Sequence, residues 1–94
     1  MVPLSELNEA QVRAAFPETD ADPAMRLLAE GITSVLDSPV LLERIRSAAI
    51  RVSGGTLSGL REAVALAQLD WRDLLMAADF ANDVHAHLRW SGTS

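Results

Sequence analysis

Residues 38–55 of this chain read SPVLLERIRSAAIRVSGG. The stretch opens with a serine and a proline, which is typical of a helix start, because a serine hydroxyl can cap a helix and proline is tolerated at its first position. It closes with the pair Gly54-Gly55, and glycine readily takes the left-handed conformation of a C-terminal cap. The sequence therefore predicts a helix from Pro39 to about Val52.

The hydrophobic residues of this segment gather on one side of a helical wheel. That side is expected to be buried and comprises Leu41, Leu42, Ile45, Ala48, Ala49 and Val52. Arg44, Ser47 and Arg51 share the opposite side. Ile50 also lies opposite the buried side, which predicts an exposed hydrophobic side chain at that position.

Local signals predict two helices before this segment. Asn8, followed three residues later by Gln11, is typical of a capping box, so a short helix from about Glu9 to Phe16 should follow. Residues 17–21 are polar and are expected to form a connector. The second helix should then begin at Asp22-Pro23 and run to about Leu36.

Three further helices are predicted after it. The first spans about Leu57 to Gln68 and is a candidate for the central helix, because its hydrophobic residues cover more than one face. Asp70 can cap a second helix, from Trp71 to about Ala78, and Asn82 a third, from Asp83 to about Trp90. The predicted fold is therefore all-α, a compact orthogonal bundle of five to six short helices. Residues 1–94 should form one domain with a frayed tail at Ser91–Ser94.

The composition argues against several classes of function. Hydrophobic residues make up 49% of the chain, but only two Trp and two Phe are present, so the core should be aliphatic. The absence of cysteine excludes a disulfide framework, a thiolate metal site and a cysteine nucleophile. A net charge of −5 disfavours a nucleic-acid partner. Because no membrane span or signal peptide is recognisable, we expect a soluble cytoplasmic protein without a membrane partner.

The two histidines are the first candidates for chemistry. His85 and His87 lie two residues apart, so on a helix their rings project about 200° away from each other and cannot share one ion. Asp83 lies on the same side as His87, but no further ligand follows at a spacing that zinc requires. We predict no metal, no cofactor and no catalytic residue, and we interpret His87 as a structural histidine hydrogen-bonded to Asp83. The alternative is a small-ligand-binding or enzymatic module that uses Asp83, His87 and Trp90.

Several large apolar side chains have no place on the predicted buried faces. Trp71 is expected in the core, whereas Trp90, next to the tail, fits a core or an interface. An exposed apolar patch of more than a few hundred Å² favours association. We therefore predict a small helical protein that acts through protein association, as a homodimer or as an accessory or regulatory subunit. The possible interface residues are Ile50, Leu69, Met76, His87 and Trp90.

Overall fold

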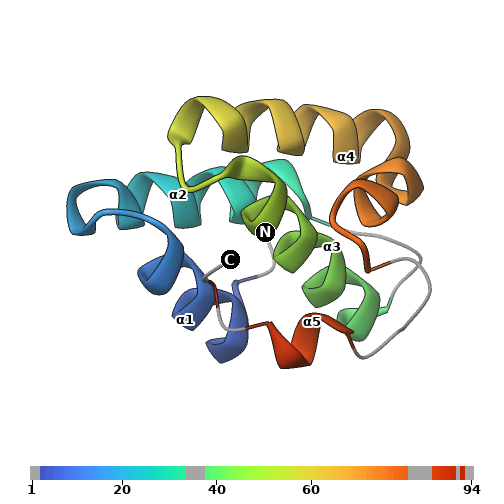
Figure 1. Cartoon of the computed structure of the whole chain (residues 1–94), viewed down its shortest axis with the longest axis horizontal. Coiled ribbons are helices and arrows are strands. Elements are labelled where there is room, and N and C mark those ends of the chain that lie inside the picture. The colour runs from blue at the N-terminus through green and yellow to red at the C-terminus, as the bar shows by residue number, and fades with distance from the viewer. Residues whose placement is uncertain (1–2, 34–37, 81–85, 91, 93–94) are drawn as a thin grey trace.

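The described residues of the chain form five helices and no strand in its computed structural model, which describes residues 3–33, 38–80, 86–90 and 92. The helices are α1 (Glu6–Ala15), α2 (Glu18–Gly31), α3 (Pro39–Ser53), α4 (Leu57–Ala77) and α5 (Ala86–Arg89). In Figure 1, α2 and α4 run alongside each other at the top, α1 lies at one side, and α5 closes the bottom. The all-α bundle predicted from the sequence is confirmed.

Helix α3 occupies the centre of the bundle, in contact with α1, α4 and α5. Its ends agree with the sequence prediction. The Ser38 Oγ accepts a hydrogen bond from the Leu41 N–H at 3.1 Å, and Gly54 takes the left-handed conformation with φ 67°. The sequence analysis expected the central helix at Leu57–Gln68, and that expectation is wrong, because neighbouring helices cover α3 on more than one side.

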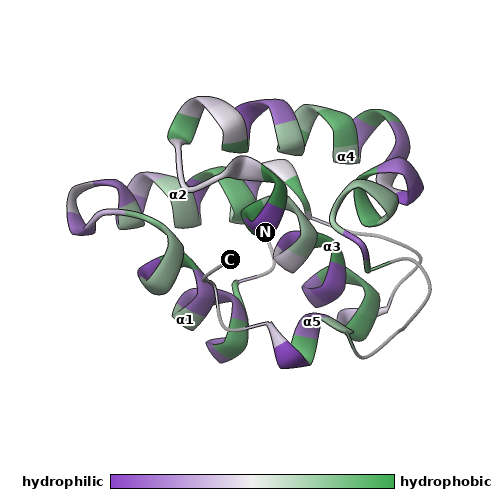
Figure 2. Cartoon of the chain, in the orientation of Figure 1, coloured by the Kyte–Doolittle hydropathy of each residue, from purple (hydrophilic) through white to green (hydrophobic). Residues whose placement is uncertain are grey.

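Because α3 is enclosed, the buried and exposed faces predicted for it from the sequence are partly wrong. Arg44, Ser47 and Ile50 are buried, although they lie opposite the expected core face. Val52, expected in the core, is 37% exposed. A single-face pattern describes a helix with one covered side, and Figure 2 shows hydrophilic and hydrophobic residues alternating along the enclosed α3.

Helix α1 begins earlier than predicted. Ser5 is its N-cap, and the Ser5 Oγ accepts from the Asn8 N–H at 3.1 Å. The capping box at Asn8 and Gln11 is therefore wrong, because both residues lie inside the helix and are buried. Serine and asparagine are equally good caps, so the local sequence did not decide between these two starts.

Helix α2 also begins earlier, at Glu18, so the polar connector predicted at residues 17–21 is mostly helical. Pro23 lies inside the helix instead of at its start, between the buried residues Ala21 and Ala24. Packing of this turn on the core overrides the start signal at Asp22-Pro23. The helix ends at Gly31, before the predicted end, and the last residues of the predicted helix, 34–36, lie outside the described part of the chain.

Helix α4 consists of two helical segments joined at a kink. Asp70 has non-helical angles, φ −157° and ψ 96°, and its Oδ1 accepts from the Arg72 N–H at 3.0 Å. The predicted cap at Asp70 is confirmed. Among the described residues, no helix is long and apolar enough to cross a bilayer.

The C-terminal part of the chain is described at residues 86–90 and 92. Residues 82–85, where the last helix was predicted to begin, lie outside the described residues, and α5 is described from Ala86. Gly92 is the one described residue of the predicted tail, Ser91–Ser94, and it is buried, while the fraying of the tail stays a prediction. A Cβ at Gly92 would lie 2.7 Å from the Gln11 carbonyl oxygen. This contact places the chain directly on the backbone of α1.

Gly31 lies where α2 approaches α4 most closely, and a Cβ there would lie 2.3 Å from Val64 Cγ1. Alanine gains about 1 kcal/mol of helix propensity over glycine, but overpacking a buried site costs about 1–3 kcal/mol. We expect Gly31→Ala to lower the free energy of unfolding, measured by urea titration, by up to about 2 kcal/mol. In a Val64→Ala background the same substitution should instead stabilise the chain. An equal effect in both backgrounds would contradict this close approach.

Candidate functional site

A buried polar network joins α1, α3 and the C-terminal end of the chain. It comprises Asn8, Gln11, Glu43 and His87. The His87 side chain is 1% exposed, and its Nε2 lies 3.2 Å from Glu43 Oε1. The partner expected for His87 was Asp83, which lies outside the described residues, as does His85. Glu43 is 44 residues away from His87 in sequence, so no local spacing could have identified it.

Asn8 and Gln11 supply the donors of the network. Asn8 Nδ2 donates to Gln11 Oε1 and to the Glu43 carbonyl oxygen, both at 3.2 Å. Gln11 Nε2 donates to the carbonyl oxygens of His87 and Trp90, both at 3.1 Å. The sequence analysis singled out Asn8 and Gln11 for their spacing of three residues. That spacing does bring the two side chains together, but in the interior of the bundle.

Two arginines of α3 bind backbone carbonyl groups of other parts of the chain. Arg46 is 1% exposed, and its Nε and Nη1 donate to the carbonyl oxygens of Ile32 and Pro3, both at 3.0 Å. Arg44 Nη2 donates to the Phe80 carbonyl oxygen. Burial lowers the pKa of the Arg46 guanidinium, but an arginine remains protonated at neutral pH. Both arginines therefore bring positive charge into the core, with backbone carbonyl groups outside the helices as acceptors.

The hydrogen bonds of this network hold side chains of α1 and α3 against α5. The imidazole of His87 faces Glu43, and among the described residues its Nδ1 has no hydrogen-bond partner. Across residues 3–33, 38–80, 86–90 and 92, no three His, Asp or Glu side chains group as metal ligands would. The proposed grouping of Asp83, His87 and Trp90 stays a prediction, because Asp83 is not described.

A substitution of Asn8 can test whether this residue is buried inside α1 or caps the start of the helix. Asn8→Asp removes both side-chain N–H donors and buries a carboxylate, so the free energy of unfolding at pH 7 should fall by about 3 kcal/mol or more. An N-cap would accept this change without loss, because aspartate and asparagine cap equally well. Urea titration followed by circular dichroism measures the difference.

The control for this test is the observed cap. Ser5→Ala should cost about 1 kcal/mol, and Ser5→Asp should cost almost nothing. If Asn8→Asp leaves the stability of the chain unchanged, the buried position of Asn8 is contradicted.

The predicted interface residues divide into an exposed pair and an internal group. Leu69 and Met76 are 85% and 68% exposed. Ile50 is 1% exposed, so the expectation that it meets solvent is wrong, since α3 is covered on that side as well. His87 is buried, and Trp90 is half-buried with its ring centroid 6.3 Å from that of Phe80. Trp71, expected in the core, is half-buried against it.

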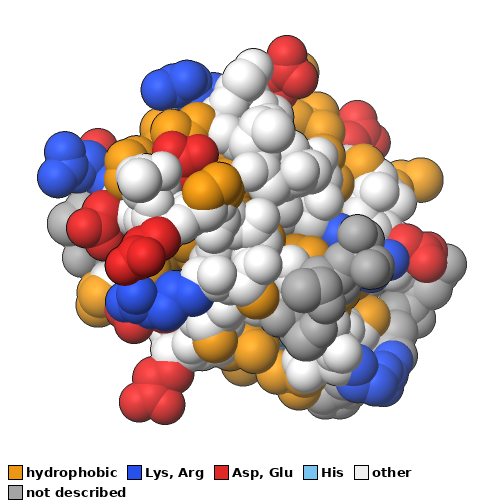
Figure 3. Space-filling model, turned by 60° about the vertical axis from the view of Figure 1, so that its left-hand side comes forward, with side chains coloured by type: hydrophobic (Ala, Val, Ile, Leu, Met, Phe, Trp, Pro, Cys, Tyr) orange, Lys and Arg blue, Asp and Glu red, His pale blue; other side chains and the backbone are white. Residues whose placement is uncertain are grey.

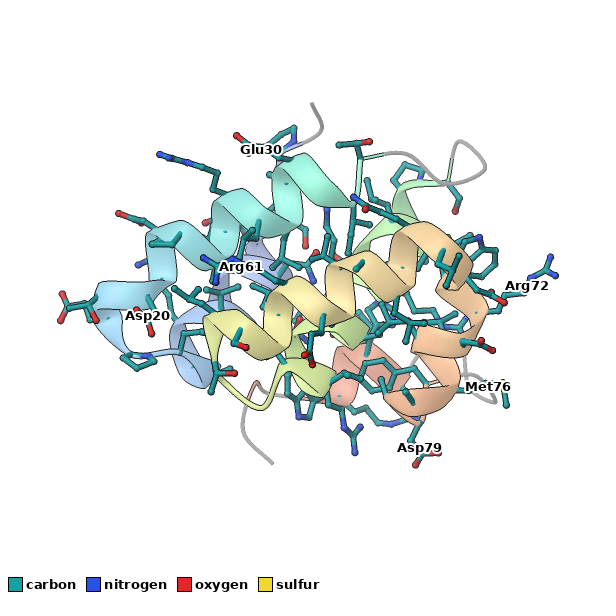
Figure 4. The ribbon with its side chains drawn as sticks, turned by 90° about the horizontal axis from the view of Figure 1, so that it is seen from above. Asp20, Glu30, Arg61, Arg72, Met76 and Asp79 are labelled. Atoms are coloured by element: carbon teal, nitrogen blue, oxygen red, sulfur yellow. The ribbon has the colours of Figure 1, made fainter. Side chains whose placement is uncertain are left out.

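The surface seen in Figure 3 carries apolar side chains scattered between acidic and basic ones. The outer side of the second segment of α4 carries the exposed Met76 near exposed charged residues. In Figure 4, Arg72 and Met76 both project away from the bundle at this end of α4. The Arg72 guanidinium also lies 5.2 Å from the centre of the Trp71 ring. This end of α4 is therefore the candidate contact surface.

Comparison of the chain with protein-family models, with curated proteins and with solved structures finds no significant match.

Proposed function

We propose that this chain acts through protein association, and that its partner is a second copy of itself bound at the kinked end of α4. The observation that carries this proposal is the exposure of Leu69 and Met76, which are 85% and 68% exposed on either side of the kink at Asp70. Large apolar side chains left in solvent are typical of a contact surface when they form a contiguous patch.

The proposed surface, which we call the α4 face, comprises Leu69, Arg72, Asp73 and Met76. All four residues are exposed. Arg72 and Met76 are four residues apart, and Asp73 and Met76 are three apart, so on the second helical segment these side chains are neighbours. The buried residues of this segment, Leu74 and Leu75, point to the core. The α4 face is thus a small apolar surface with one charge of each sign beside it.

The α4 face carries both a positive and a negative charge, and this favours a second copy of the chain as the partner. In a two-fold symmetric dimer the same patch meets itself, so each residue of one copy faces a different residue of the other. An antiparallel pair of α4 faces can place Arg72 of each copy against Asp73 of the other, with the Met76 side chains between them. A surface of one sign would repel its own copy.

Substitutions in the α4 face test the dimer. Met76→Glu puts a charge in the apolar centre of the contact, where desolvation is costly, so it should weaken self-association at least about tenfold. Val40→Glu is the matched control, because Val40 is 64% exposed but lies at the start of α3. Analytical ultracentrifugation of the wild-type chain and both variants measures the dissociation constants.

A charge exchange tests the proposed geometry. Arg72→Asp should weaken the dimer by repulsion from Asp73 of the other copy, and adding Asp73→Arg to the same chain should restore it. If the double variant associates no better than the single one, this pairing is wrong. A wild-type chain that stays monomeric at millimolar concentration would contradict self-association and leave a different protein as the partner.

A further inference from the structure

The C-terminal residues form a strap across the seam between α1 and α3. We define the C-terminal strap as residues 86–90 together with Gly92. One side chain of α1 holds it at two points, because Gln11 Nε2 donates to the carbonyl oxygens of both His87 and Trp90 at 3.1 Å. A single amide group thus connects the beginning and the end of one helical turn to α1.

The strap cannot owe its conformation to its own helix. Helix α5 has four residues, and helices of this length are not stable without tertiary contacts. Its contacts with the bundle are the buried His87 beside Glu43 and the half-buried Trp90 beside Phe80. Leu88 adds little to these contacts, because its side chain is 52% exposed. The strap is therefore ordered by docking alone.

The docked position leaves polar atoms buried without partners. His87 Nδ1 and Trp90 Nε1 are enclosed, and neither has a hydrogen-bond partner among the described residues. Asn8 Oδ1, in the polar network beneath, is in the same state. Each of these atoms would bond to water if the strap moved away. A buried polar atom without a partner is unfavourable. The docked strap should therefore open more easily than one in which every buried polar atom has a hydrogen bond.

A hollow of about 290 Å³ lies between the strap and the ends of α1 and α3, with Ile50, Arg51 and Trp90 among its lining residues. Gly92 completes the contact with α1, at φ 95°, and a Cβ there would lie 2.8 Å from the Cβ of Ala14. The contact between Gly92 and α1 thus depends on the absence of a side chain at this position.

We propose that the C-terminal strap opens and closes over the α1–α3 seam as one unit while α1 to α4 stay folded, with Gln11 as its latch. Opening hydrates the indole of Trp90 and the imidazole of His87, and it uncovers Ile50 and Phe80. The proposed motion involves no residue of the α4 face.

The indole N–H of Trp90 reports directly on the strap, because the chain has only two tryptophans and the other, Trp71, belongs to α4. The substitution Gln11→Leu removes the side-chain amide that serves as the latch, and it changes the volume of the side chain only little. Hydrogen exchange of the Trp90 indole, measured by NMR on the full chain, should become at least about tenfold faster, since two hydrogen bonds of the closed state are lost. Backbone amides in α2 and α4 should keep the exchange rates of the wild-type chain.

Gln68→Leu is the matched control. Gln68 Nε2 also donates to a backbone carbonyl, that of Gly31, at 2.9 Å, but it connects α4 to α2. This variant should leave the Trp90 indole unchanged. Gly92→Val, which places a side chain against α1, is a second way to lift the strap and should reproduce the effect of Gln11→Leu. The proposal is overturned if Gln11→Leu leaves the Trp90 indole protected, if it accelerates amides throughout the chain equally, or if Gly92→Val unfolds α1 to α4.

Discussion

The enclosure of α3 is the constraint on which the rest of the structure depends. A helix covered on more than one side must bury side chains from several faces, and in α3 these include Arg44 and Arg46. A buried guanidinium needs acceptors for its N–H groups. The carbonyl oxygens of Ile32, Pro3 and Phe80 supply them, so the end of α2, the N-terminal segment and the chain after α4 all converge on α3.

The same constraint produces the polar network on the α1 side. Glu43 precedes the two arginines on α3 and meets His87, while its carbonyl oxygen accepts from Asn8. Gln11 extends these contacts to the C-terminal strap. Two surfaces of different character result. The strap is held by polar contacts beside an open hollow, whereas the α4 face carries apolar residues that the bundle does not use.

The outcome of the sequence analysis depended on whether a feature was local. The cap at Ser38, the left-handed Gly54 and the break at Asp70 agree with prediction, because each is set by contacts within about four residues. The predicted start of α1 was wrong, since Ser5 and Asn8 are caps of similar local strength. The predicted start of α2 was wrong because packing on the core overrides the signal at Asp22-Pro23. Exposure was predicted correctly for Leu69 and Met76 but not for Ile50, because a helical wheel cannot show how many neighbours a helix has.

Amino-acid composition, helical periodicity and capping residues were sufficient to establish an all-α bundle and most of its helices, because these properties arise from short-range steric and hydrogen-bonding preferences. Only packing decided that α3 lies at the centre, that Glu43 pairs with His87, and that Gln11 binds the carbonyl groups of His87 and Trp90. Those contacts join residues 44 to 79 positions apart, and such partners are chosen by the shape and polarity of the assembled helices, which no local pattern contains.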